Sequence, residues 1–531
     1  MQSNRVCSAC LAMLLAGLPA GAAAQALPPS DAAAALAALS AGAQPAQTTV
    51  QERMPVSFVL REVVLAGPSG YFSPERLQAV MAPFIGARIA TAGTDVLASA
   101  INDLYATEGI SFAQAWVVGA DPVRGVVTLE LFEARLGRIV TVSRRLSEAY
   151  LSRRLGLRSG ILADTRLIGE RLERLSLTDG LLADAGFSPG AEPGTTDLTI
   201  RFAEPPAVQG SVNMDNYGTD PENPRFTGKL VFNSPTGSGD TLAFNMLLDR
   251  NLHWLNASYI RPVGSEGTKL GVTLSGEWET DDGSLNREGF EQSLTFDVSH
   301  PLVLSPEKTL WLVASLEAFD DQASVLGVAS RDQSGLAFSL SLSGGYNPGE
   351  GRGLAASWSI GVISGLYDDG IAGLENAAFG LLSASGQVSV AQGEWGRLSL
   401  VGNAQVATGD PIPLGFQFPV TSPKAVAGYP PGLSAGETGL WARAEIQAAR
   451  PMGAGAVSLL PFAFVAAGQA FDRAPGGWQG QGVASAGGIG LSGRWGERAS
   501  FDFQAAWPLS EVLGQGGDSE PSLHLNIAMT F

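Results

Sequence analysis

The last nine residues of the chain, Leu523-His524-Leu525-Asn526-Ile527-Ala528-Met529-Thr530-Phe531, alternate between large apolar side chains and small or polar ones. Successive side chains of a β-strand point to opposite faces, so this period of two predicts a strand with one apolar and one polar face. The same alternation recurs at 270–279 and 336–343. We count about 16 such segments between residues 210 and 531, separated by Gly, Asp, Asn, Ser and Pro. Since a transmembrane strand takes about 9–11 residues, residues 207–531 are predicted to form a 16-stranded transmembrane β-barrel.

A soluble β-sandwich or propeller is the alternative reading of this region. Three features favour the membrane barrel: an export signal at the N-terminus, a terminal Phe531 on an alternating strand, and the lack of cysteine in so large an exported β-domain. A closed barrel also satisfies every backbone amide in lipid and has no free sheet edge.

Composition excludes several classes of protein. The 531 residues are 45% hydrophobic and only 16% charged, which is too apolar for a disordered chain. Outside the N-terminus there is no uninterrupted apolar run of about 18 residues, so we expect no membrane-spanning helix in the mature protein. The net charge of -18, with 29 Arg and 4 Lys, also argues against a nucleic-acid partner.

Residues 1–26 are typical of a secretory signal peptide. Arg5 supplies the positive start, an apolar stretch spans 11–18, and cleavage is expected after Ala24 or Ala26. An N-terminal core helix is the alternative. Both cysteines, Cys7 and Cys10, lie inside this segment, so the mature chain is predicted to have no disulfide, thiolate metal site or cysteine nucleophile.

A leader follows at 27–55. Ser30 and Asp31 are positioned to cap a short Ala-rich helix over 32–39, which is followed by a polar linker. Such a short helix is marginal alone in water, so we expect it to dock against another part of the protein. A disordered leader explains the segment equally well.

Residues 56–134 and 135–206 read as two short α/β units of the order βααββ. In the first, a strand at 58–66 precedes helices that begin at Ser73-Pro74 and Asp95, and strands at 112–118 and 125–132 close the unit. The second has a strand at 138–143, helices at 147–155 and 163–177, and two short strands ending at 202. Two tandem copies of one unit suggest a modular binding arm.

The motifs that resemble catalytic or ligand-binding sequences occur in the wrong context. Residues 432–436 match a nucleophile elbow, but they lie in a turn, and the three histidines of the chain are scattered. Residues 488–493 fit GxGxxG but lie within a strand pattern without a following helix. Asp215, Asp220 and Glu222 fit a calcium loop less well than a solvated acidic loop. We therefore predict no catalytic, cofactor-binding or metal-ligating residues, and a protein that is not an enzyme.

The order of these segments resembles a known family. Signal peptide, short helix, linker, two POTRA-like units and a 16-stranded barrel are similar to the TpsB transporters of two-partner secretion, the hemolysin secretion/activation and filamentous-hemagglutinin exporter family. The local strings that carry the resemblance are Ile101–Tyr105, Pro189–Leu198, Asp215–Gly218, Asn233–Asp240 and Ser258–Pro262.

The resemblance implies a function and a location. The protein would lie in the outer membrane of a Gram-negative bacterium, where periplasmic POTRA domains bind an unfolded TpsA-like exoprotein and the barrel passes it to the cell surface. It would contact outer-membrane lipids and, during biogenesis, periplasmic chaperones and the barrel assembly machinery, and it would need no cofactor. Two alternatives remain open: an assembly factor of the BamA or TamA type, and a passive barrel whose arm tethers a partner. The sequence does not identify the cargo.

In this family a long extracellular loop folds back into the barrel with a Val-Arg-Gly-Tyr tip. The matching residues here are Val426, Ala427, Gly428 and Tyr429, so the arginine is missing. Its family partner is an aspartate on a barrel strand, and the matching wall residues are Phe462, Phe464, Ala466 and Gly468.

Ala466 stands where the family has that aspartate, so both halves of the ion pair are absent together. Removing one partner of a buried pair costs about 3–5 kcal/mol, whereas replacing both can be nearly neutral. We therefore expect the loop to enter the lumen near this strand without its ionic latch. Phe531 is expected to be the C-terminal barrel signal.

Overall fold

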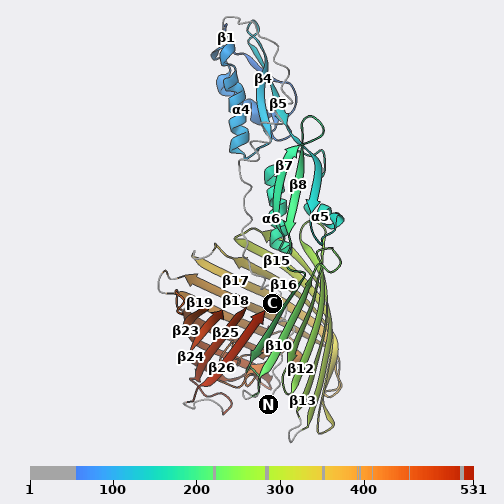
Figure 1. Cartoon of the computed structure of the whole chain (residues 1–531). Coiled ribbons are helices and arrows are strands. Elements are labelled where there is room, and N and C mark those ends of the chain that lie inside the picture. The colour runs from blue at the N-terminus through green and yellow to red at the C-terminus, as the bar shows by residue number, and fades with distance from the viewer. Residues whose placement is uncertain are drawn as a thin grey trace. The chain divides into compact units, whose positions relative to one another are not determined.

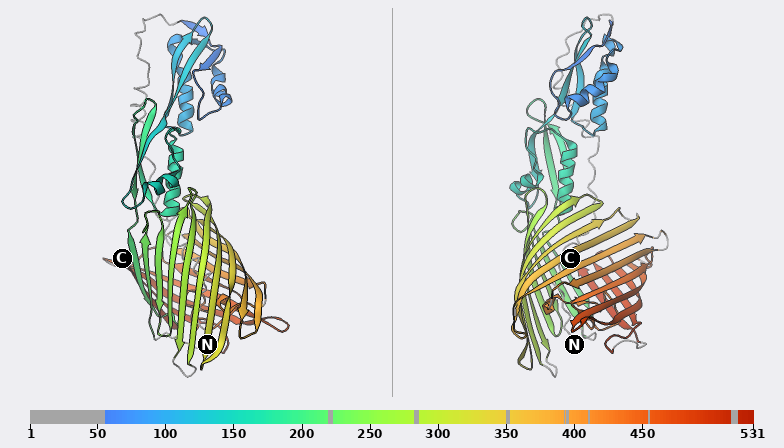
Figure 2. Two further views of the ribbon diagram at one scale, coloured as in Figure 1. Left: turned by 90° about the vertical axis from the view of Figure 1, so that its right-hand side faces the viewer. Right: turned by 180° about the vertical axis from the view of Figure 1, so that it is seen from behind.

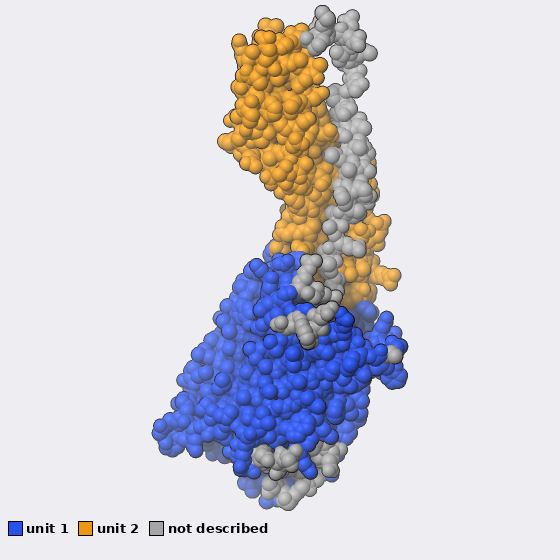
Figure 3. Space-filling view, turned by 90° about the vertical axis from the view of Figure 1, so that its left-hand side faces the viewer, with its two compact units in different colours: residues 1–21, 206–531 blue, residues 22–205 orange. Residues whose placement is uncertain are grey.

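The computed structural model describes residues 56–218, 223–281, 286–349, 353–391, 393, 396–409, 411–453, 455–514 and 520–531. The predicted signal peptide, the leader 27–55, Asp220 and Glu222 lie outside the described residues. The chain divides into two compact units, of which one ends at Pro205 and the other runs from Pro206 to the C-terminus (Figure 3). We call them the α/β region and the barrel.

The α/β region contains a first α/β unit. Its elements are β1 (Ser57–Val59), β2 (Glu62–Leu65), α3 (Pro74–Met81), η1 (Ala82–Phe84), β3 (Arg88–Ala90), η2 (Thr91–Gly93), α4 (Asp95–Thr107), β4 (Ala113–Asp121) and β5 (Val126–Glu133). The sheet order is β2-β5-β4, with β2 parallel and β4 antiparallel to β5. Ser73 caps α3, with Pro74 at the first helical position, as the sequence predicts.

The strand expected at 58–66 is divided in two. β1 pairs with β3, whereas β2 pairs with β5, so the chain changes sheets at Leu60 and Arg61. The backbone amide of Arg61 donates to the carbonyl oxygen of Gly125 at 2.8 Å, and Leu60 exchanges backbone bonds with Gly86 and Ala87. These partners are distant in the sequence, which is why the pattern of apolar residues did not reveal the break.

A second α/β unit repeats the topology of the first. It consists of β6 (Arg135–Val142), α5 (Glu148–Leu155), α6 (Thr165–Asp179), β7 (Leu182–Pro189) and β8 (Thr195–Ala203), with the sheet order β6-β8-β7. Ser147 and Asp164 cap the two helices, and Gly156 and Gly180 end them in the left-handed conformation. The central strand β8 is parallel to β6 and antiparallel to β7, just as β5 is parallel to β2 and antiparallel to β4 in the first unit.

One apolar core joins the two α/β units. Phe112, Phe132 and Ala134 of the first unit belong to the buried core that otherwise comprises residues of the second. The ring centroids of Phe112 and Phe187 are 4.6 Å apart, and Phe112 is fully buried. The backbone amide of Arg135 also donates to the carbonyl oxygen of Gly194 at 3.0 Å. The two α/β units are therefore packed against each other through a shared core and are not joined by a linker alone.

Glu204 fastens the end of β8 to the turn before α5. Its carboxylate accepts hydrogen bonds from the Ser143 hydroxyl, the amides of Arg144 and Arg145, and Nε of Arg145 at 2.9 Å. Burial acts to raise the pKa of Glu204, but these donors outweigh it and lower the pKa from 4.5 to about 2. The carboxylate is thus held ionised in the folded state.

This pKa shift predicts an acid-sensitive contribution to stability. Because the folded pKa of Glu204 lies below the unfolded value, its contribution is fully present above 4.5 and is lost as pH falls toward about 2. In urea unfolding of a 56–205 fragment, we expect the difference in unfolding free energy between the native chain and Glu204→Gln to shrink across that pH range. Glu192→Gln, at an exposed position in the same unit, is the control. A difference that is constant with pH would contradict the prediction.

The barrel contains 16 antiparallel strands that close on themselves, as the sequence predicts. They are β9 (Val208–Asp215), β10 (Arg225–Asn233), β11 (Thr241–Leu248), β12 (Leu252–Val263), β13 (Thr268–Asp281), β14 (Arg287–Leu304), β15 (Lys308–Val325), β16 (Val328–Tyr346), β17 (Leu354–Asp369), β18 (Leu374–Ala391), β19 (Arg397–Ala407), β22 (Thr438–Gln447), β23 (Val457–Ala474), β24 (Gly477–Trp495), β25 (Ala499–Pro508) and β26 (Ser522–Thr530). The red C-terminal strands meet the green first strands where β26 pairs with β9 (Figure 1).

The closing seam is short. β26 and β9 share five residue pairs, from Asn526↔Asp215 to Thr530↔Ser211. Asn216 extends the seam with its side chain, since Nδ2 donates to the carbonyl oxygen of Leu523 and Oδ1 accepts from the amide of Leu525, both at 2.9 Å. The side-chain amide thus adds to a backbone bond at the same position, from the amide of Asn216 to the carbonyl oxygen of Leu525 at 3.3 Å.

The apolar face of the barrel strands points outward. Two further views show these strands running around one curved wall (Figure 2). Leu274 is 59% and Met529 57% exposed, whereas polar side chains at inward positions, such as Asn256 and Gln504, are buried. This arrangement is the reverse of a soluble β-domain and suits a wall that faces lipid. The alternation read from the sequence is therefore confirmed, and the sandwich alternative is wrong.

No helix within the described ranges is long and apolar enough to cross a membrane.

Candidate functional site: a loop folded against the inner wall

The long connection between β19 and β22, residues 408–437, lies against the inner face of the barrel. We call it the inner loop. It contains η3 (Leu414–Phe416) and the short hairpin β20 (Phe418–Pro419) and β21 (Ala435–Gly436). Backbone bonds from Val420 to Ser434 and from Gly432 to Thr421 hold its two arms together. The inner loop thus has a defined, hydrogen-bonded structure.

The tip of the inner loop consists of Val426, Ala427, Gly428 and Tyr429. Val426 and Ala427 are fully buried, and Tyr429 is 2% exposed. Val426 and Tyr429 share an apolar cluster with the wall residues Ala466, Ala470, Ala484 and Ala486. The tip therefore packs on the inner faces of β23 and β24.

The other wall residues named from the sequence lie around this contact. Phe464 clusters with Ala427, and Phe462 packs against the same group. At Gly468 a Cβ would lie 2.6 Å from the Cβ of Trp441 and 2.7 Å from Cγ1 of Val420, so glycine is needed there. Val465, between the two inward positions 464 and 466, is 60% exposed, which shows that the tip contacts the inner face.

Tyr429 anchors the tip through its hydroxyl. This oxygen lies 2.8 Å from the carbonyl oxygen of Ser485 on β24 and 2.7 Å from that of Ser510 beyond β25, and it accepts from the Ser485 amide at 3.2 Å. The tyrosine therefore connects the tip to two segments of the wall at once.

Arg443 also belongs to this site, although the family resemblance assigned it no role. It lies on β22 directly opposite Ala466 of β23. Its guanidinium carbon is 3.6 Å from the centroid of the Phe464 ring, and the residue is only 8% exposed. The signal was present in the sequence, because alternation places Trp441, Arg443 and Glu445 on one face, but the strand register was needed to place the charge beside the missing aspartate.

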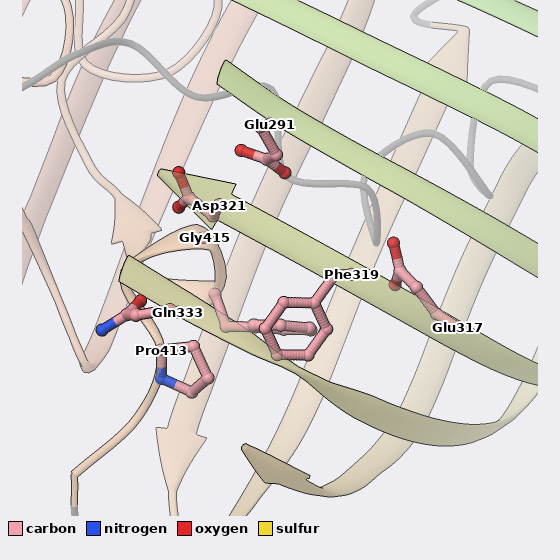
Figure 4. A pocket seen from close by; sticks show the side chains of 8 residues that line it. Glu291, Glu317, Phe319, Asp321, Gln333, Pro413 and Gly415 are labelled. Carbon is pink, nitrogen blue, oxygen red and sulfur yellow. The ribbon is translucent and has the colours of Figure 1, made fainter. Parts of the chain in front are cut away.

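The first arm of the inner loop meets the wall at a small acidic hollow. Figure 4 shows Glu291, Glu317, Asp321 and Gln333 on the wall, with Pro413 and Gly415 of the loop on the other side. Asp321 is paired with Arg331 at 2.6 Å. Within the described parts of the chain, no group of three or more His, Cys, Asp or Glu is arranged to hold a metal ion.

The two misleading motifs have structural explanations. Residues 432–436 belong to the inner loop, where Ser434 is buried and its amide donates to the Thr421 hydroxyl at 3.0 Å. Gly488 and Gly490 lie in the middle of β24, where a Cβ would come within 2.5 Å of Phe464 and 2.1 Å of Phe462. The first two glycines of GxGxxG therefore leave space for inward aromatic rings.

Phe531 ends the chain at the seam. It exchanges two backbone bonds of 2.9 Å with Gly210, and a Cβ at Gly210 would lie 2.3 Å from its ring. The ring itself is 66% exposed, on the apolar outer face.

Gly428 provides a test of the seated tip. Its φ is +93°, and a Cβ would lie 3.0 Å from the backbone nitrogen of Pro508, so Gly428→Val adds a clash to a backbone strain of about 1–2 kcal/mol. We expect the tip to leave the wall and the conductance of the full chain in planar bilayers to rise severalfold. Gly373→Val is the matched control, since φ is +65° but no atom lies within 4 Å of the added Cβ. Equal conductance in the two variants would contradict the prediction.

Comparisons with known proteins agree with this architecture. Residues 58–134 match the family model "POTRA domain, ShlB-type". None of the curated proteins matches the chain. Among solved structures, CdiB from Escherichia coli is 18% identical, with a TM-score of 0.68 over 96% of this chain and 100% of that chain.

Two further structures share the fold. CdiB from Acinetobacter baumannii is 16% identical, with a TM-score of 0.62 over 96% of this chain and 100% of its own. BamA from Haemophilus ducreyi lacking POTRA domains 1-3 is 13% identical, with a TM-score of 0.58 over 90% of this chain and 100% of its own. The fold that the resemblance implied, a closed barrel with an N-terminal POTRA region, is therefore confirmed.

Proposed function

We propose that this chain, which contains a ShlB-type POTRA domain and shares the CdiB fold, is a TpsB transporter of two-partner secretion. The proposal rests on the combination of that POTRA domain with a closed 16-stranded barrel. The inner loop of this barrel packs against the inner face of its wall. The second α/β unit, which has the same topology, would be a second POTRA domain.

The proposed location follows from the outward apolar face. The barrel would lie in the outer membrane, in contact with its lipids, and both POTRA domains would lie in the periplasm. Residues 1–26 would be removed on export, and the leader 27–55 would help to plug the resting pore together with the inner loop. Phe531 would be read as the C-terminal signal by the barrel assembly machinery, after periplasmic chaperones deliver the chain.

The partner would be an unfolded TpsA-like exoprotein that adds as a strand to an exposed sheet edge, a mode in which main-chain hydrogen bonds give sequence-tolerant affinity. The described edges differ in one respect. On β4, the side-chain amide of Asn102 bonds both the carbonyl oxygen and the amide of Ala115, at 3.1 and 2.7 Å, and so blocks that edge at Ala115. The corresponding edge in the second unit is β7, and we assign the cargo to it.

Transport would need no catalysis. The cargo would pass through the barrel and be drawn outward by folding outside the cell, so the protein would be a conduit without cofactor, metal or enzymatic activity. The alternative is an assembly factor of the BamA or TamA type, which the weaker likeness to BamA keeps in view. The ShlB-type POTRA domain and the higher TM-scores to CdiB favour secretion.

The proposal is tested by quantitative proteomics of the culture medium and the outer membrane, with and without the gene. We expect one large protein to disappear from the medium while other barrels stay unchanged, and that protein is then the cargo. A general fall in outer-membrane barrels would replace the proposal with the assembly-factor function. No change in either fraction, with the cargo gene expressed, would overturn both.

A further inference from the structure

A charged residue of the barrel wall, Arg443 on β22, holds the inner loop. Arg443 Nη1 lies 3.3 Å from the carbonyl oxygen of Pro423, three residues before the loop tip. Its Nη2 donates to Oε1 of Gln504 at 3.1 Å, and Nε2 of Gln504 donates to the same Pro423 oxygen at 2.7 Å. One loop carbonyl therefore receives two donors from β22 and β25, which themselves are joined by a hydrogen bond.

Arg443 is fixed before it meets the loop. Nη2 also lies 3.1 Å from Oε2 of Glu445 on the same strand, and the guanidinium stacks on Phe464. An arginine with a carboxylate partner and an aromatic face keeps its orientation with little loss of side-chain freedom. The loop thus docks on a preformed donor.

Three more glutamines hold the inner loop in the same manner. Gln333 on β16 accepts from the amide of Leu414, Gln405 on β19 donates to the carbonyl oxygen of Phe416, and Gln481 on β24 donates to that of Ala435, at 3.0, 2.7 and 2.6 Å. With Gln504, four wall strands use a side-chain amide on the backbone of the loop. These contacts depend little on the identity of the loop side chains, because the glutamines bond only to main-chain groups of the loop.

We propose that Arg443, supported by Gln504, is the positioning residue that retains the inner loop, in place of an arginine on the loop tip. The inference deepens the proposed function, since it concerns the gate of the same conduit, but its readout needs no cargo. When the loop leaves, Arg443 keeps Glu445 and Phe464, so no buried ion pair is separated and no charge is stranded on the tip. The loop is released by breaking hydrogen bonds to neutral groups of its own backbone.

The chain supplies a natural reporter of this release. Lys424 follows Pro423 directly and is exposed on the loop, whereas the other three lysines, Lys229, Lys269 and Lys308, lie in barrel strands. A lysine-specific protease added outside intact cells cannot enter a 16-stranded barrel but can reach a loop that has left it. Cleavage after Lys424 yields a C-terminal fragment that starts at residue 425.

The experiment measures that fragment over time in the native full-length chain and in Arg443→Ala, Gln504→Ala and Arg443→Lys. We expect Arg443→Ala to raise the cleavage rate about tenfold, as for loss of one charge-assisted hydrogen bond, and Arg443→Lys to fall between it and the native chain. Gln504→Ala removes the second donor to Pro423 and is expected to raise the rate less. Ala466→Asp is expected to raise it too, because the new carboxylate lies opposite Arg443 and draws it away from Pro423.

Two controls separate release from misfolding. Arg225→Ala, made together with Asp215→Asn so that no buried charge is stranded, removes an inward arginine that is paired with Asp215 at 2.9 Å and should leave cleavage at Lys424 unchanged. Cleavage at Lys229 or Lys269, in the strands themselves, would show that a variant has not folded; if Arg443→Ala fails in this way, Gln504→Ala and Ala466→Asp carry the test.

Several results would overturn the inference: equal cleavage in the native chain and in the folded variants, an equal rise in the double variant Arg225→Ala with Asp215→Asn, or complete cleavage of the native chain. The assay uses no cargo. If loss of the gene leaves the secreted proteins unchanged but the cleavage rate depends on Arg443, the proposed function is refuted and the inference about Arg443 stands.

Discussion

Arg154→Ala is expected to lower the unfolding free energy of the α/β region by about 3–5 kcal/mol, the usual result of stranding one partner of a buried ion pair. Nη2 of Arg154 lies 2.8 Å from Oδ2 of Asp179, with the two side chains 0% and 3% exposed. The same carboxylate accepts from the Tyr150 hydroxyl at 2.8 Å, and the guanidinium donates to Thr178. Without Arg154, Asp179 stays buried beside a hydroxyl that cannot neutralise it.

Urea unfolding of the 56–205 fragment provides the measurement. Arg124→Ala is the control, since its pairing with Asp121 is loose at 3.9 Å and the arginine is 82% exposed, so we expect a loss of about 0.5 kcal/mol or less. The double variant Arg154→Met with Asp179→Leu should recover much of the lost stability, because it removes both charges. A loss of less than about 1 kcal/mol for Arg154→Ala would contradict the argument.

Phe112→Ala is the second change with a large expected effect. Removing a fully buried phenylalanine costs about 3–5 kcal/mol, and here the cavity opens between the two α/β units, where Phe112 meets Phe187. We expect the single unfolding transition of the 56–205 fragment in calorimetry to divide into two, because the shared core no longer couples the units.

Phe58→Ala separates lost stability from lost coupling. Phe58 is 6% exposed and belongs to the core of the first unit alone. Because the shared core is intact, this variant should lose stability and keep one transition, at a lower midpoint. Two transitions in the native fragment, or one in Phe112→Ala at an unchanged midpoint, would show that the units do not depend on the shared core.

The predictable part of the fold rests on periodicity and caps. Alternation at 523–531 reports directly which residues face outward, because a strand has a period of two whatever it pairs with. The helix starts at Ser73 and Ser147 were equally readable, since the cap acts within its own first turn. These signals are local, and the sequence is sufficient for them.

The unpredicted part rests on partners that are distant in the sequence. The break in the strand at 58–66 depends on Gly125, and the role of Arg443 depends on the register that sets it opposite Ala466. Resemblance located the loop tip and its strand but indicated only that a charge pair was missing. The position of Arg443 beside the loop could be read only from the order and register of strands β22 to β25.

The seam between β26 and β9 has a consequence for the order of assembly. Its bond from Leu525 to Asn216 joins residues 309 apart, whereas every other pair of neighbouring strands is joined by a much shorter stretch of chain. Long-range closure is entropically unfavourable and slow, so we expect the hairpins to form first and the five seam pairs last. Until then the growing sheet has two unpaired edges, either of which can accept a foreign strand. The chain is therefore most open to aggregation after nearly all of its strands are in place, immediately before the two ends meet.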